Sequence, residues 1–161
     1  MFGLFYPLAT IVVVYLIKRY LEFELKRAAS FTQHINWIVW ALVLQVSAVV
    51  VSSLLDSHIG NFIQHGLGGG VVMTLLFVYF VKTFEIRANW RILSLVLFGF
   101  VCAFGVINEL AEFAGSLLGV GVFSFDSHDT WRDLFANTTG MVVAWLIILA
   151  TYTSKKKTLT S

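Results

Sequence analysis

Apolar residues along the chain form five blocks that are separated by short polar stretches. The blocks cover residues 2–17, 36–55, 60–81, 92–113 and 134–152. Their lengths are close to the roughly 17–25 residues with which an α-helix crosses a hydrocarbon core of about 30 Å. The pattern therefore predicts an all-α fold, a polytopic transmembrane bundle of about five spanning helices.

Composition supports this class and excludes a soluble globular protein. Of the 161 residues, 58% are hydrophobic and only 12% are charged. This length suffices for one bundle, so we expect a single transmembrane domain over residues 1–161 and no separate soluble domain. The chain has one cysteine, Cys102, which excludes a disulfide framework and a cysteine metal cluster.

The first block differs from the others in what surrounds it. No basic residue precedes it, and Lys18 and Arg19 follow it directly. This order predicts an uncleaved anchor rather than a removed signal peptide. Residues 21–34 then alternate charged and apolar side chains, which indicates a short amphipathic segment lying in the membrane interface.

Basic residues occupy alternate connections, and short loops rich in lysine and arginine stay in the cytoplasm. The connections around residues 56–61 and 115–130 contain neither residue type. Five spans then give an outside N-terminus and a cytoplasmic C-terminus, in a multi-pass protein of the cell membrane, the inner or plasma membrane of a bacterium. The basic segments carry Lys18, Arg19, Lys26 and Arg27, then Lys82, Arg87 and Arg91, and finally Lys155, Lys156 and Lys157.

Polar side chains collect at the outer ends of three predicted spans, at one depth. At 1.5 Å per residue, His65, Glu109 and Asn137 each lie about 6–8 Å inside the end of their helix. Residues three or four apart share a helix face, so each span presents one polar stripe. The stripes consist of His58, Asn61 and His65; of Asn108, Glu109 and Glu112; and of Asp129, Asp133 and Asn137.

Charged groups in a membrane helix turn toward protein or water, so these stripes should converge on a pocket open to the outer face. We expect a divalent cation there. Carboxylates with one or two imidazoles suit Zn²⁺, Mn²⁺ or Fe²⁺, and oxygen-only sites suit Mg²⁺ or Ca²⁺. The predicted metal ligands are His58, His65, Glu109, Glu112, Asp129 and Asp133, and the predicted substrate-binding residues are Asn61, Asn108, Arg132 and Asn137.

A purely structural interpretation is also open. Membrane bundles use Asn, Gln, His and paired carboxylates as interhelical hydrogen-bonding groups, and one protonated Glu beside His65 needs no metal. Arg132 either binds an anionic substrate or pairs with Asp129 or Glu112. The loop residues Asp56, Asp126 and His128 are expected to be simply solvated.

The run "HGLGGG" at residues 65–70 resembles a phosphate-binding loop only superficially. It lacks the following Lys-Ser/Thr and the strand-to-helix setting of a P-loop. Gly66 and Gly70 instead form the small-residue spacing that lets membrane helices approach closely. We expect packing to be the role of these glycines.

Three stretches carry a resemblance to known families: "DSHIGNFIQHGLGGG", "NELAEF" and "DTWRDLFANTTGMVVAW". Together they resemble the VanZ-like group of small membrane proteins and a related family of inner-membrane proteins of unknown function. Asp129, Asp133, Asn137 and Gly140 match the most specific family motif in order. Glu112 stands where the VanZ-like pattern usually has Gln, which favours the second family. The resemblance implies a role in the cell envelope.

Three classes of function fit these features. The first is a metal-dependent membrane enzyme, with Glu109 or Glu112 as general base, acting on a lipid or lipid-linked compound. The second is an accessory protein that binds a lipid or antibiotic without turnover, and the third is an ion or proton carrier. The expected partner in the first two is a membrane lipid or lipid-linked substrate, and no nucleic acid.

Overall fold

The computed structural model describes the backbone of residues 5–119 and 127–158 and the side chains of residues 7–119 and 127–152. Over these ranges the fold is all-helical, as the hydropathy pattern predicts. The helices are α1 (Phe5–Leu25), α2 (Asn36–Ser53), α3 (Ser57–Ile63), η2 (Gln64–Val71), α4 (Val72–Thr83), α5 (Trp90–Leu117) and α6 (Ser127–Thr158).

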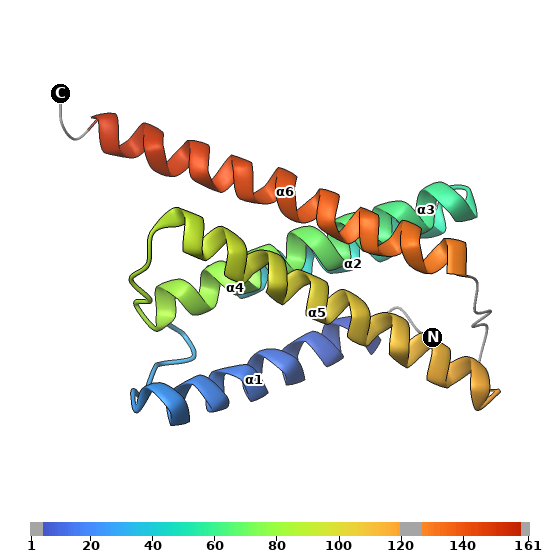
Figure 1. Ribbon diagram of the computed structural model, residues 1–161, viewed down its shortest axis with the longest axis horizontal. Coiled ribbons are helices and arrows are strands. Elements are labelled where there is room, and N and C mark those ends of the chain that lie inside the picture. The colour runs from blue at the N-terminus through green and yellow to red at the C-terminus, as the bar shows by residue number, and fades with distance from the viewer. Residues whose placement is uncertain (1–4, 120–126, 159–161) are drawn as a thin grey trace.

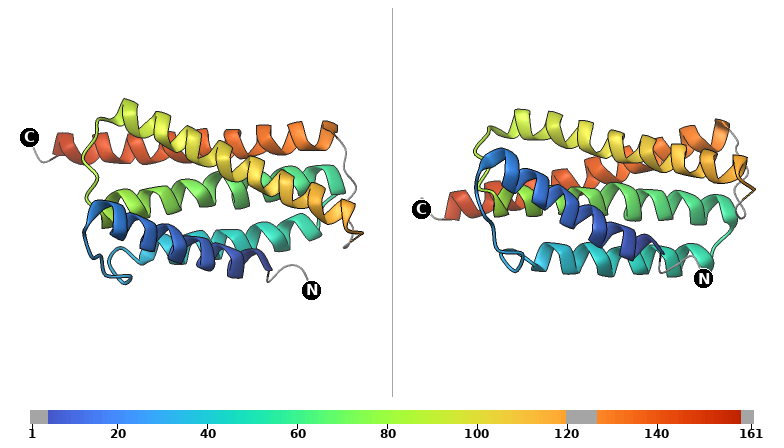
Figure 2. Two further views of the ribbon diagram at one scale, coloured as in Figure 1. Left: turned by 60° about the horizontal axis from the view of Figure 1, so that its bottom comes forward. Right: turned by 90° about the horizontal axis from the view of Figure 1, so that it is seen from below.

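The helices run alternately up and down, and α3, η2 and α4 follow one another as a single rod (Figures 1 and 2). One end of the bundle, here called the polar end, is where α2 and α5 end and α3 and α6 begin. The opposite end, here called the basic end, is where α1 and α4 end and α2 and α5 begin. The connections that hold Lys26, Arg27 and Arg87 lie together at the basic end.

Among the described residues, four helical stretches are long and apolar enough to cross a membrane: Ile35–Ser53, Ser57–Thr83, Trp90–Leu117 and Ser127–Tyr152. They correspond to the last four predicted spans, but most begin earlier in the chain than hydropathy indicates. Polar residues start these helices. Asp56 caps α3 by accepting the His58 N–H at 3.0 Å, and Asn89 caps α5 by accepting the Ile92 N–H at 3.0 Å.

α1 differs from these four because its apolar part is short. The described apolar stretch, residues 5–17, spans only about 20 Å, and the helix continues to Leu25 rather than ending near residue 17. Lys18 and Glu22 form an ion pair at 2.5 Å one turn apart. The Lys18 ammonium and the Ala29 N–H hold the pKa of Glu22 below its ordinary value, which stabilises this extension above the acidic range.

The short amphipathic helix predicted over residues 21–34 does not form as a separate element. Residues 21–25 form the end of α1, and residues 26–35 form turns and irregular backbone. Lys26 and His34 adopt left-handed conformations, with φ of 49° and 58°, and such residues commonly end helices. The charges at positions 18–24 therefore extend α1 instead of making a new helix.

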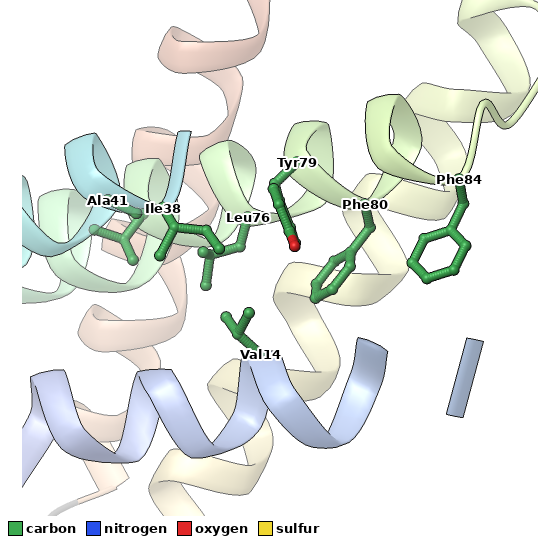
Figure 3. Packing of buried hydrophobic residues seen from close by; sticks show 8 residues of the cluster. Val14, Ile38, Ala41, Leu76, Tyr79, Phe80 and Phe84 are labelled. Carbon is green, nitrogen blue, oxygen red and sulfur yellow. The ribbon is translucent and has the colours of Figure 1, made fainter. Parts of the chain in front are cut away.

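The main apolar core lies toward the basic end, between α1, α2 and α4 (Figure 3). Val14 of α1 is 1% exposed and packs against side chains of both other helices. The buried members of this cluster are Val14, Ile38, Ala41, Val72, Leu76, Tyr79, Phe80 and Phe84. This cluster fixes α1 to the bundle at the end away from the polar residues.

The closest helix packing is between η2 and α6, and glycines make it possible. A Cβ at Gly140 would collide with the carbonyl of Gly66, and one at Gly70 would collide with the backbone of Asn137 and Met141. The packing role predicted for Gly70 is confirmed, whereas a Cβ at Gly66 would make only an ordinary contact with the Ala136 carbonyl at 3.6 Å. The close packing of η2 on α6 holds the residues around position 65 directly against α6.

Candidate metal centre

Three helices each bring one metal-binding side chain to the same place near the polar end. They are His65 of η2, Glu109 of α5 and Asp133 of α6, and one ligand atom from each lies within 4.8 Å of the other two. Asp133 is 1% exposed, and the His65 side chain is 11% exposed. The group is therefore enclosed by protein.

Small residues one turn away account for this convergence. A Cβ at Gly69 would collide with the side-chain amide of Asn137. On α5, a Cβ at Gly105 would lie only 3.0 Å from Leu134 and 3.2 Å from Asn137. Asn137 therefore faces a glycine on each of the two adjacent helices. This lets η2 and α5 approach α6 at the level where His65 and Glu109 meet Asp133.

The distance between His65 and Asp133 suits two ligands of a single cation. His65 Nε2 lies 3.3 Å from Asp133 Oδ2. Two ligands bound at about 2.0–2.2 Å to a tetrahedral zinc are themselves about 3.3–3.6 Å apart. A histidine with two carboxylates is also the donor set expected for Zn²⁺, Mn²⁺ or Fe²⁺ rather than for Ca²⁺.

Asn61 holds the Asp133 carboxylate in place. Its Nδ2 donates to Asp133 Oδ1 at 2.8 Å and approaches Asp129 Oδ1 at 3.4 Å. The second oxygen of Asp133 is the one facing His65. A hydrogen bond of this kind fixes the orientation of a carboxylate ligand and tunes its affinity.

Two buried oxygen atoms at this level lack a hydrogen-bond partner among the described residues: Glu109 Oε1 and Asn137 Oδ1. A buried polar atom without a partner costs about 1–3 kcal/mol. Nor do the ion pairs of the described lysines and arginines include Glu109 or Asp133. The two carboxylates therefore lack a cationic partner from the described side chains other than His65.

Glu112 lies outside the three-residue group. It accepts a hydrogen bond from Asn108 Nδ2 at 2.8 Å, one turn back on the same helix. This pair therefore lies beside the group rather than within it. Asn108 also lines the neighbouring cavity.

His58, Asp129 and Arg132 form a more exposed cluster at the polar end. Arg132 Nη1 lies 2.9 Å from His58 Nδ1 and 3.5 Å from Asp129 Oδ1. The pairing of Arg132 with Asp129 is thus present, whereas His58 and Asp129 are not members of the close metal-binding group. The remaining loop residues differ: Asp56 caps α3, His128 is exposed, and Asp126 lies outside the described residues.

A cavity of about 240 Å³ adjoins the metal-binding group. Residues of α1, α2, η2, α4, α5 and α6 line it, and most of them are apolar or small. His65, Asn108 and Asn137 form polar parts of its wall, so the cavity and the metal-binding group share His65.

The sequence did not identify Thr10 as a partner for Gln45. Thr10 Oγ1 donates to Gln45 Oε1 at 2.9 Å, and both residues are buried in the cavity wall. Each has apolar residues on both sides in the chain, Ala9 and Ile11 around Thr10 and Leu44 and Val46 around Gln45. That isolation in two successive spans was the available signal, but it does not reveal which helix faces meet.

Comparison of the chain with protein-family profiles, with curated proteins and with solved structures found no match. The resemblance to the VanZ-like group and its relatives stays a prediction from the motifs.

Proposed function

We propose that this chain is a multi-pass membrane protein of the cell envelope. In this proposal it binds a divalent metal through His65, Glu109 and Asp133 and acts on a membrane lipid or lipid-linked compound. The observation that carries the proposal is the meeting of three ligand atoms from three helices, one of them belonging to a carboxylate with an unpartnered oxygen.

Charge balance supports a divalent ion. Two ionised carboxylates and a neutral imidazole carry a charge of −2, which a divalent cation cancels. Uncompensated charge inside a membrane bundle costs several kcal/mol per group. Arg132 supplies no compensation at this point, because its carboxylate partner is Asp129.

The bound ion would supply Lewis acidity toward a phosphoryl or acyl oxygen, or would lower the pKa of a bound water. Glu112 lies three residues from Glu109 on α5 and is oriented by Asn108. In this proposal Glu112 serves as the general base, and Asn61 keeps Asp133 positioned for the metal. Arg132, near the surface, provides a positive charge for an anionic head group.

Elemental analysis of protein purified in detergent without chelator tests the proposal. We expect about one zinc, manganese or iron per chain. Protein that is folded, carries less than a tenth of an equivalent of any divalent metal, and gains none on dialysis against these ions would contradict it.

The orientation of the bundle follows from the basic-loop rule, with the polar end outside and the basic end in the cytoplasm. In a Cys102→Ser background, Ser127→Cys should react with a membrane-impermeant maleimide in intact cells. Arg87→Cys should react only after permeabilisation. Reversed labelling would place the metal-binding group on the cytoplasmic side.

Carrier activity is not expected, because a polar path toward the basic end is missing among the described residues. The hydroxyls of Ser47, Thr74 and Ser94 each donate to the backbone carbonyl four residues back in the chain. Alternating access needs a site that opens to both faces. Reconstituted vesicles should show cation and proton flux equal to that of empty vesicles; flux that Glu109→Gln abolishes would favour a carrier.

A further inference from the structure

The cavity beside the metal-binding group has the lining expected of a hydrocarbon site. Alanine and glycine open space in three of its walls: Ala9 of α1, Ala48 of α2, and Gly68 and Gly69 of η2. Met73, Val101 and Phe104 contribute apolar surface. Cavities lined mostly by apolar groups, with a few polar ones, are typical of ligand-binding sites, and a lining this apolar suits a hydrocarbon chain.

Part of the polar lining lies at the metal-binding group, whereas Thr10 and Gln45 are polar residues of the wall formed by α1 and α2 and pair with each other. His65 belongs both to this lining and to the group, Asn108 precedes Glu109 in the chain, and Asn137 lies one helical turn after Asp133. Asn137 is 4% exposed and its Oδ1 has no hydrogen-bond partner among the described residues. A ligand in this cavity would therefore meet apolar walls along most of its length and a hydrogen-bond acceptor beside the metal ligands.

The cavity is bordered by α1 and α5 on the side where these two helices pack least. α1 packs chiefly on α2, and the helix pairs with extensive contact do not include α1 with α5. The α5 residues Ile107 and Ala111 line the cavity and are also exposed, Ile107 to 57%. Both residues lie within α5 rather than at its last residue, so the cavity wall reaches the side of the bundle, which in a membrane protein is in contact with lipid.

We propose that the cavity binds the hydrocarbon chain of an amphiphilic lipid, which enters from the bilayer between α1 and α5. The chain occupies the space between Ala48, Gly68 and Phe104, and the head of the lipid lies beside His65. The position of the head rests on the proposed metal function. Binding of the chain depends on the apolar lining alone, so the two are separable by experiment.

The test uses the full-length protein in phosphatidylcholine vesicles that contain a fatty acid with a photoreactive diazirine in its chain. After irradiation, mass spectrometry locates the adducts. We expect adducts on the inward-facing residues Met73 and Val101, in addition to those on the lipid-facing surface. Adducts confined to outward-facing residues such as Leu95 would overturn the proposal.

Filling the cavity provides a second readout. A Cβ at Gly68 has only Ala48 Cβ nearby, at 3.9 Å, so Gly68→Leu should fit and occupy the space. Adducts on Met73 and Val101 should fall severalfold. The matched control is Gly99→Leu, since Gly99 has open space around it, and its adduct pattern should equal that of the wild type. Inner adducts that persist in a folded Gly68→Leu protein would contradict the proposal.

The two proposals fail in different ways. Glu109→Gln should lose metal yet keep the inner adducts, because the cavity lining does not include Glu109. Adducts on the inner residues of a wild-type protein that carries no metal would contradict the proposed metal function and leave the hydrocarbon site standing. Metal binding without adducts on the inner residues would contradict the hydrocarbon site and leave the metal function standing.

Discussion

Glu109→Gln, His65→Ala and Asp133→Asn are each expected to abolish stoichiometric metal binding. His65→Ala removes the imidazole of the group, and each of the other two changes replaces a carboxylate by a neutral amide, which is a much weaker metal ligand. Changes in residues that only orient a ligand weaken metal sites about 10–100-fold. Loss of a ligand should therefore weaken the affinity by more than about 100-fold, and metal should be lost during purification.

Variants of two neighbouring residues should reduce the metal affinity less. Asn61→Ala removes the 2.8 Å hydrogen bond to Asp133 but leaves every ligand atom, so affinity should fall about 10–100-fold. Glu112→Gln changes a carboxylate outside the group, one that accepts from Asn108, and metal content should stay near that of the wild type. The measurements are metal per chain and dissociation constants from competition with a chromogenic chelator.

Chelation offers an independent readout. A metal that binds only the folded state stabilises it by about 2.7 kcal/mol when present at 100 times its dissociation constant. Chelator should therefore lower the melting temperature of the wild type and leave Glu109→Gln unaffected. A wild type without metal whose melting is insensitive to chelator would mean that the carboxylates form a protonated hydrogen-bonded network instead.

Gly140→Ala is expected to destabilise the protein strongly, by about 2 kcal/mol or more. The new methyl group would collide with the backbone carbonyl of Gly66. Backbone cannot rotate away as a side chain can, so η2 and α6 must separate, and overpacking of this kind typically costs about 1–3 kcal/mol. The same separation should reduce metal affinity, because His65 and Asp133 lie on the two helices concerned.

Gly99→Ala is the matched control, since a Cβ there meets no atom within 4 Å. Helix propensity favours alanine over glycine by up to about 1 kcal/mol, so this variant should be as stable as the wild type or slightly more so. Unfolding in mixed micelles, followed by loss of helical signal, gives both values. Equal stability of the two variants would show that the glycine contact is not a tight one.

Much of the architecture could be predicted because hydropathy reports directly on membrane burial. Four of the five apolar blocks match helices suited to span a membrane. The ends of these helices were predicted less accurately. Residues such as Asp129 read as loop by hydropathy, yet they begin α6, since a polar first turn is compatible with a helix.

The residues of the candidate site could be predicted from the sequence, but their arrangement in space could not. Helical spacing placed Glu109 with Glu112 and Asp129 with Asp133 on shared faces, and equal depth linked these stripes to His65. Only the packing between helices reveals that Glu112 lies outside the close group and that Gly105 admits Asn137. Such contacts depend on how the helices are rotated and crossed, which periodicity along one helix does not contain.

The π-helical segment η2 gives the rod from α3 to α4 a sensitivity to chain length. Each of its backbone hydrogen bonds encloses one residue more than an α-helical hydrogen bond does. Asn61 and His65 therefore point in a different direction around the helix axis, relative to Leu76 and Tyr79, than they would in a regular α-helix. Deleting one residue between Gln64 and Val71 would let a regular helix form with all its bonds intact. The core side of α4 and the metal-binding side of α3 would then no longer face their partners together, so in this stretch the number of residues matters as much as their identity.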